Sequence, residues 1–249
     1  MRRIHVPQVN GIYWGGILLA SVFGTNLGDY YAHESGLGII PGLLVLAFLT
    51  LPLFILERFD GSAHTLYYWL VIVIIRTGAT NIADYLQFRV RVPQLRLCLV
   101  LAALIALFGY WQQRLSANLN QRPSLTSVGL PDSGPPYWLA MLGAGVFGTV
   151  LGDVCSHVFG QGTASIGLGV LLALSLTLWR HSWGAIVAIY WLTVAVARTT
   201  GTAIGDWLAE SKDLNFGLAA ATVMSGIAFA GLLLLSQRRQ ATATPSNPD

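Results

Sequence analysis

Charged side chains are scarce in this chain. Asp, Glu, Lys and Arg together make up 10% of its 249 residues, whereas a soluble globular domain carries about 25%. Lysine is almost missing, with Lys212 as the only copy, and cysteine occurs only at Cys98 and Cys155. This composition argues against a disordered chain and against a soluble enzyme. The two cysteines exclude a disulfide framework and a zinc site built on a cysteine cluster.

Sequence motifs of catalysis are also missing. The chain has no His-Glu-x-x-His, no Gly-x-Ser-x-Gly and no Walker loop, so the sequence predicts neither an enzyme nor a bound cofactor. No cleavable signal peptide is expected, because the first apolar run, from Gly11, is longer than the hydrophobic segment of such a peptide. The arginine excess is typical of membrane-protein loops, so a nucleic-acid partner is not expected.

Hydrophobic residues make up 54% of the chain and gather in long runs. A bilayer core of ~30 Å needs ~20 apolar residues per helix. The sequence therefore predicts an all-α membrane protein with eight transmembrane helices, and a lipid bilayer as its main partner. The expected helices cover residues 12–33, 36–56, 64–88, 92–112, 136–158, 163–180, 183–208 and 214–236.

A polar connection rich in Pro, Ser and Asn divides these stretches into two groups of four. The predicted organisation is a first half over residues 1–113, a linker over 114–135, a second half over 136–239 and a disordered tail over 240–249. The sequence leaves the oligomeric state open.

The loops differ in basic residues, and the richer side is expected to be cytoplasmic. One side holds Arg2, Arg3, Arg58, Arg114, Arg122, Arg180, Arg238 and Arg239. The other side holds Arg89, Arg91, Arg96 and Lys212. This count predicts that both termini are cytoplasmic.

An internal repeat is the most informative feature. The pair Tyr-Trp occurs four times, and in each copy a Thr follows the Tyr by 12 positions and an Asp follows it by 16. The tryptophans are Trp14, Trp69, Trp138 and Trp191; the threonines are Thr25, Thr80, Thr149 and Thr202; the aspartates are Asp29, Asp84, Asp153 and Asp206. Fixed spacing without gaps indicates four parallel repeats of two helices each.

The repeats alternate in kind. The first and third share Phe-Gly-Thr-x-Leu-Gly-Asp-x-x-x-His, at residues 23–33 and 147–157. The second and fourth share Arg-Thr-x-x-Thr-x-Ile-x-Asp, at residues 76–84 and 198–206. The two halves are therefore expected to be pseudo-symmetric.

With these motifs the chain resembles a family of bacterial membrane proteins of unknown function, built from four tandem two-helix repeats with a characteristic tryptophan in each. The resemblance covers residues 11–236 and rests on the four tryptophans named above. The second repeat departs from the others, with Ala79 and Ala83 where they have glycine. The resemblance implies this fold and a bacterial inner-membrane location, and it implies no activity.

Small residues four positions apart accompany the motif and predict close helix packing. The glycines of these pairs are Gly24, Gly28, Gly148, Gly152, Gly201 and Gly205. We expect the four motif helices to form a central cluster with the other helices outside it. The Tyr-Trp pairs are expected in the cytoplasmic aromatic belt, with each Asp ~24 Å further along its helix.

Charges at membrane depth need partners, because each costs at least ~2.5 kcal/mol to insert. Arg76 and Arg198 are expected near the midplane. One interpretation is structural, with each arginine paired to the aspartate on its own helix, Asp84 or Asp206. The other is a polar cavity between the central helices, lined by the repeated Thr and Asp and opening outward.

Two Asp-x-x-x-His pairs favour the cavity interpretation. Asp29/His33 and Asp153/His157 offer two carboxylates and two imidazoles, which suit a divalent metal such as Mn²⁺, Zn²⁺, Co²⁺ or Ni²⁺. The sequence thus predicts a transporter of a small cation, a divalent metal exchanged for protons, with Asp29 and Asp153 as proton carriers. One alternative is an anion or carboxylate transporter that uses Arg76 and Arg198. Another is a non-transport protein whose Asp/Arg network is structural.

Overall fold

Long helices account for nearly all of the residues that the computed structural model describes. It describes residues 7–59, 65–118, 134–181, 187–212, 214 and 216–243. Within these residues there are eight α-helices: α1 Gly11–Asp29, α2 Ile39–Phe59, α3 Thr65–Asp84, α4 Gln94–Asn118, α5 Pro135–Phe159, α6 Gln161–His181, α7 Val187–Glu210 and α8 Leu218–Ala243. Each expected apolar stretch contains one of them, which confirms the all-α class.

Six of the described helices, α3 to α8, are long and apolar enough to cross a membrane. This finding indicates a multi-pass membrane protein. The helix α1 is outside this group because glycine and polar residues replace aliphatic ones on its buried faces, and α2 contributes a shorter apolar stretch, Ile39–Leu53.

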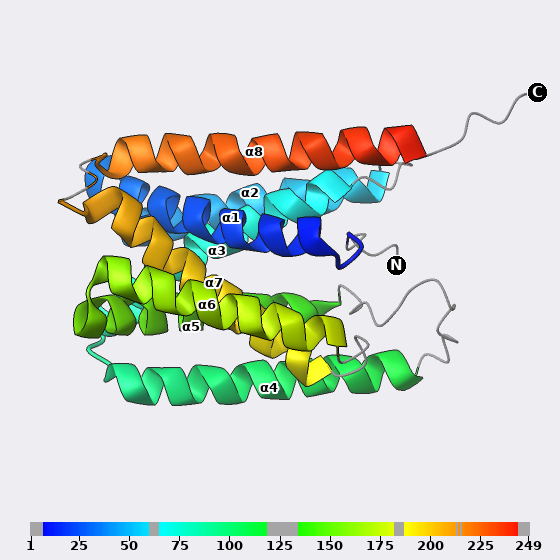
Figure 1. Ribbon diagram of the computed structural model, residues 1–249, viewed down its shortest axis with the longest axis horizontal. Helices are drawn as coiled ribbons and strands as arrows, with labels where there is room; N and C mark the ends of the chain where they lie inside the picture. The colour runs from blue at the N-terminus through cyan, green and yellow to red at the C-terminus, as the bar shows by residue number, and fades with distance from the viewer. Residues whose placement is uncertain are drawn as a thin grey trace, which may run out of the picture.

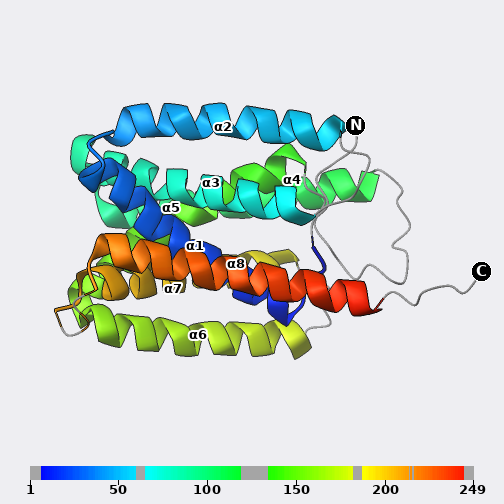
Figure 2. The ribbon, with the colours of Figure 1, turned by 90° about the horizontal axis from the view of Figure 1, so that it is seen from above.

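Four helices form the centre of the bundle. In cyclic order α1, α3, α5 and α7, each packs against the next, and α7 closes the ring on α1. The four remaining helices lie outside this ring, with α4 opposite α8 and α2 opposite α6 (Figures 1 and 2). The outer faces are aliphatic: Phe48 and Leu95, for example, are more than 70% exposed.

Each outer helix packs mainly against the central helix that follows it in the chain. Thus α2 packs on α3, α4 on α5 and α6 on α7, while the last helix, α8, returns to α1. The contact between α8 and α1 brings the two ends of the chain together. The helix α1 therefore begins, and α8 ends, at the same end of the bundle (Figure 1).

Glycines permit the close approach of the central helices. A Cβ on Gly24 of α1 would lie 2.6 Å from the Arg76 side chain of α3, and one on Gly28 would lie 3.0 Å from the Thr77 carbonyl oxygen. A Cβ on Gly148 of α5 would lie 2.8 Å from backbone of Arg198. The remaining paired glycines make the same kind of contact: Gly152 faces Thr202, Gly201 faces Ser21 and Gly205 faces Asn26.

The boundaries of the predicted halves differ slightly from the helix ends. The helix α4 continues to Asn118, inside the predicted linker 114–135, and α8 continues to Ala243, inside the predicted tail 240–249. Residues 119–133 and 244–249 lie outside the described residues. The turn between α5 and α6 is tight: it consists of Gly160, whose φ of +82° favours glycine.

Candidate functional site: an acidic cavity in the helical ring

A polar cavity of about 480 Å³ opens where the four central helices end. All four repeat aspartates line it, and so do three of the repeat threonines, Thr25, Thr80 and Thr149. The other ionisable residues along its wall are His33, Glu34, His157 and Glu210. Residues as far apart in the sequence as Thr25 and Leu218 thus meet in one site, with six carboxylates among them.

Two of these carboxylates are hydrogen-bonded to amides. Gln87 Nε2 donates to Asp153 at 3.0 Å, and its own Oε1 accepts from Gln94 at 2.8 Å. Gln161 Nε2 donates to Glu210 at 2.8 Å. These amides thus donate a hydrogen bond to one carboxylate of α5 and to one carboxylate of α7.

The opposite side of the cavity ends in two π-helical turns, Tyr30–Glu34 after α1 and Tyr85–Arg89 after α3. A π-turn holds more residues per turn than an α-helix. His33, in the first of these turns, keeps a ligand atom within 4.8 Å of Asp29 and also approaches the neighbouring helix. Its Nε2 lies 3.7 Å from Asp84 of the neighbouring helix α3.

Three potential metal ligands meet at this point. One ligand atom each from Asp29, His33 and Asp84 lies within 4.8 Å of the others. The predicted set of Asp29, His33, Asp153 and His157 does not form a single cluster among the described residues. The reason is that α5 continues as a regular helix through His157 to Phe159, so the third repeat lacks the π-turn of the first.

Below the aspartates, the guanidinium of Arg76 lies at the centre of the ring. Its Nη1 donates to Thr80 at 2.8 Å and to Thr149 at 3.0 Å, and its Nη2 donates to Thr202 at 2.6 Å and to Thr25. Each central helix supplies one of these hydroxyls. The four repeat threonines therefore surround one buried cation.

Arg198 occupies the equivalent position on α7, the helix opposite α3, and points the other way. Its Nη1 donates to Ser21 at 3.2 Å, and its Nη2 lies 3.6 Å from the sulfur of Met141. Both arginines are fully buried. Among the described residues no carboxylate lies within 4.0 Å of either guanidinium, so the predicted pairs Arg76–Asp84 and Arg198–Asp206 are not formed.

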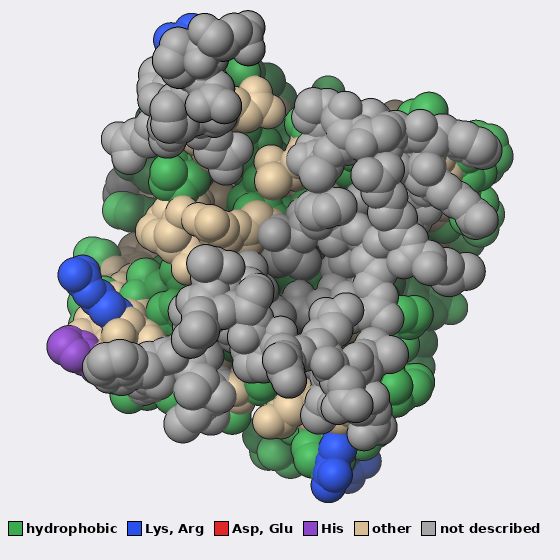
Figure 3. Space-filling view, turned by 90° about the vertical axis from the view of Figure 1, so that its right-hand side faces the viewer, with side chains coloured by type: hydrophobic (Ala, Val, Ile, Leu, Met, Phe, Trp, Pro, Cys, Tyr) green, Lys and Arg blue, Asp and Glu red, His purple; other side chains and the backbone are tan. Residues whose placement is uncertain are grey.

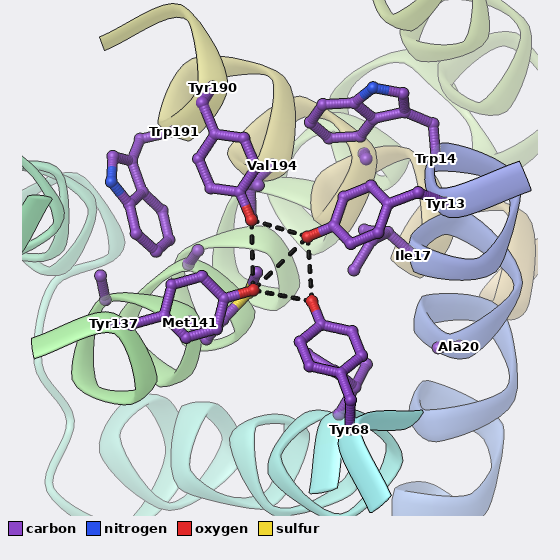
Figure 4. Packing of buried hydrophobic residues seen from close by; sticks show 14 of the residues in the cluster. Tyr13, Trp14, Ile17, Ala20, Tyr68, Tyr137, Met141, Tyr190, Trp191 and Val194 are labelled. Atoms are coloured by element: carbon purple, nitrogen blue, oxygen red, sulfur yellow. Dashed lines mark hydrogen bonds between the residues drawn. The ribbon is translucent and has the colours of Figure 1, made fainter. Parts of the chain in front are cut away.

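The four repeat tyrosines close the end of the ring beyond Arg198. Their hydroxyls form a cycle with oxygen-to-oxygen distances of 2.9 Å from Tyr13 to Tyr68, 2.7 Å from Tyr68 to Tyr137, 3.2 Å from Tyr137 to Tyr190 and 2.6 Å from Tyr190 to Tyr13 (Figure 4). None of the four side chains is more than 2% exposed.

The Tyr-Trp pairs thus lie near one end of the central helices, with their side chains directed into the ring and not to its outer surface. Besides the tyrosines, Trp14, Trp69 and Trp191 are also buried. Each repeat tyrosine ring contacts the tryptophan that directly follows it in the sequence edge to face. Trp138 is half-buried. Aromatic residues at one end of a helix suit either a lipid interface or a protein core, and here the ring of helices encloses them.

Other residues of the site carried no periodic signal. Gln87 and Gln94 belong to the second repeat alone, and Gln161 to the third. The repeat tyrosines did carry a periodic signal, because they keep the same spacing to Thr and Asp in every copy of the repeat. That spacing could have placed them on the same inward face.

Comparison with known proteins gives one match. Residues 189–242, which cover most of α7 and α8, match the family described as Repeat of Unknown Function (DUF347). The match identifies a helical repeat in this part of the chain. No curated protein and no solved structure matches the chain.

Proposed function

We propose that the chain is a bacterial inner-membrane protein whose eight helices cross the bilayer as four parallel two-helix repeats in two pseudo-symmetric halves. The support is that equivalent side chains from the four central helices meet at two levels. The four tyrosine hydroxyls bond to one another, and the four threonine hydroxyls bond to one guanidinium.

The proposed orientation places the tyrosine end and both termini in the cytoplasm. Among the described side chains at that end, the charged ones are Arg114, Arg180 and Arg238, at the ends of the outer helices. The space-filling view of this end has Lys/Arg and His side chains at its edge and no Asp or Glu among the described residues (Figure 3). Basic residues are enriched in cytoplasmic loops.

The proposed activity is transport of a small cation, a divalent metal, through the acidic cavity in exchange for protons. The observation that carries this proposal is a cavity lined by six carboxylates with buried side chains beneath it. At its other end, Arg76, Arg198 and the tyrosine cycle fill the axis. A path open to one side favours a carrier over a static pore.

The cluster Asp29, His33 and Asp84 is the proposed metal site. Two carboxylates and one imidazole within 4.8 Å of one another suit a borderline divalent ion better than an alkali ion. Asp29 and Asp153 are the proposed proton carriers, because Asp/His chains in transporters relay protons.

Transport of an anion on the arginines is the weaker alternative. Both terminal nitrogens of Arg76 already donate to threonines, and six carboxylates stand between its guanidinium and the opening. An anion would meet repulsion on entry and no free terminal N–H at the floor.

Calorimetry on the detergent-purified protein tests the proposal, with Mn²⁺, Zn²⁺, Co²⁺ and Ni²⁺ as probes. We expect saturable binding of at least one ion to the intact chain. His33→Asn should weaken binding at least tenfold, whereas His157→Asn, the matched change in the third repeat, should weaken it much less.

Proteoliposomes then separate binding from transport. A pH gradient should drive uptake of the ion that binds, and Asp153→Asn, which changes a proposed proton carrier outside the metal cluster, should abolish the dependence on the gradient. No binding of any of the four ions to the folded intact protein would refute the metal proposal. Equal losses in the two histidine variants would refute the assignment of the site to one side of the cavity.

A further inference from the structure

The four threonines around Arg76 have the geometry of a cation site. Each hydroxyl is oriented by a hydrogen bond to a carbonyl of its own helix, from Thr25 to Ser21 at 2.9 Å and from Thr202 to Arg198 at 3.2 Å, for instance. Thr80 and Thr149 make longer contacts of the same kind. With their protons directed at the helix backbone, the hydroxyls present lone pairs to the axis of the ring.

A tethered guanidinium occupies this arrangement. The four threonines are at most 2% exposed, and Arg76 is fully buried without a carboxylate within 4.0 Å among the described residues. The positive charge is thus held by neutral oxygens, one from each of four helices. Carbonyl or hydroxyl oxygens arranged in this way around an axis are the means by which channel filters replace the hydration shell of a monovalent cation.

The neighbouring layer makes room for this arrangement. Arg76 and Arg198 stand at equivalent positions of opposite helices, and the same position holds Ser21 on α1 and Gly145 on α5. Ser21 leaves space for the two long side chains, which extend in opposite directions along the axis, and Gly145 lets α5 approach α3, because a Cβ there would lie 2.7 Å from that of Ala79. Only Arg76 reaches the threonines; Arg198 has one hydroxyl and one sulfur as partners.

We infer that the threonine ring is an axial binding site for a monovalent cation, and that the guanidinium of Arg76 occupies this site in place of a free ion. The guanidinium closes the axis below the acidic cavity and keeps free monovalent cations out of the ring. If the proposed transport is correct, a substrate ion held by the aspartates can pass only when Arg76 leaves the threonines. The binding part of the inference does not depend on that transport.

Chemical rescue tests the inference. Arg76→Ala should lower the thermal unfolding midpoint of the detergent-purified protein by several degrees. Guanidinium chloride at low millimolar concentration should restore at least half of that loss, because the ion can reach the ring through the cavity that Thr25, Thr80 and Thr149 line. Urea, which has a similar shape and no charge, should restore none.

Arg198→Ala is the matched control, because it removes the other buried arginine from a site without a threonine ring. Guanidinium should not restore its unfolding midpoint. Equal rescue of both variants, rescue by urea, or no rescue of a folded Arg76→Ala protein would overturn the inference. Failure of metal binding to the intact chain would refute the proposed function and leave this result unaffected.

A second measurement applies if Arg76→Ala does not fold. In the intact chain, Thr202→Val should lower the midpoint clearly more than Thr193→Val, which removes a buried hydroxyl of the same helix that bonds only to the backbone of Ile189. When both threonine variants are made in an Arg76→Met protein, Thr202→Val should lower the unfolding midpoint no more than Thr193→Val does. An equal loss for both threonine variants in the intact chain would contradict the inference.

Discussion

At the scale of single residues, the repeat tyrosines and threonines bring their buried hydroxyls together in two rings of four. Each tyrosine hydroxyl has one proton, and a cycle of four hydroxyls needs one proton per bond, so every oxygen can both donate and accept. The tryptophans that follow pack against the tyrosine rings and exclude lipid and water. Satisfied buried networks of this kind specify one packing of the helices.

Removal of one hydroxyl from the cycle tests its contribution to stability. Tyr68→Phe should lower the free energy of unfolding by about 1–3 kcal/mol, because it leaves two buried hydroxyls without one partner each. Tyr30→Phe, on an exposed side chain, should change it by less than about 0.5 kcal/mol. Equilibrium unfolding of both variants provides the comparison, and equal stabilities would show that the cycle contributes nothing.

At the scale of secondary-structure elements, the ends of the central helices decide which side chains meet. The helices α1 and α3 finish in π-turns, whereas α5 and α7 keep regular geometry to Phe159 and Glu210. His33, in the π-turn after α1, lies beside both Asp29 and Asp84, whereas His157, on the regular end of α5, joins no such cluster among the described residues. Two repeats with the same Asp-x-x-x-His motif therefore present different arrangements of ligands.

Helix packing at the glycine pairs gives a second prediction at this scale. Gly148→Ala should destabilise the protein by about 1–3 kcal/mol, because its Cβ would lie 2.6–2.9 Å from Arg198 and the backbone of Thr199. Gly167→Ala on α6, where no atom lies within 4 Å of the new Cβ, should instead stabilise it by up to about 1 kcal/mol. Chemical denaturation of the two variants measures both values. A loss of equal size at both positions would mean that close packing is not the reason for Gly148.

At the scale of the whole molecule, the two ends of the bundle differ in charge and in access. One end has six carboxylates around an open cavity, and the other has arginines around a closed tyrosine cycle. The contact of α7 with α1 closes the ring, and α8, the last described helix, packs on α1 from outside the ring. Under the proposed transport function, this arrangement would correspond to one state of an alternating-access carrier.

The proposed orientation can be checked by reporter fusions. Green fluorescent protein fused after Asp249 should fluoresce, and alkaline phosphatase fused at the same place should be inactive, because the basic end is expected in the cytoplasm. The same two reporters fused after Gly38, in the turn before α2, should give the reverse pattern. Active phosphatase at Asp249 would invert the proposed topology and place the acidic cavity on the cytoplasmic side.

The sequence by itself determined the helical class, the approximate position of every described helix and the recurrence of Tyr, Thr and Asp at equivalent positions of four helices. Hydropathy is a local property of ~20 neighbouring residues, and the Tyr, Thr and Asp of the repeat recur at fixed spacing, so both can be read without knowledge of the fold. The sequence also indicated that Gly148 and its equivalents lie between helices, because small residues four apart share a face.

Only the tertiary structure decided how those residues combine. Nothing in the spacing of Arg76 distinguishes an ion pair with Asp84 from a bond to four threonines, because that choice depends on where three other helices place their side chains. The burial of the tyrosines and the turn of His33 toward Asp84 likewise depend on ring closure and on π-turns at two helix ends. Local periodicity selects a face of a helix, and packing between helices selects the partner on that face.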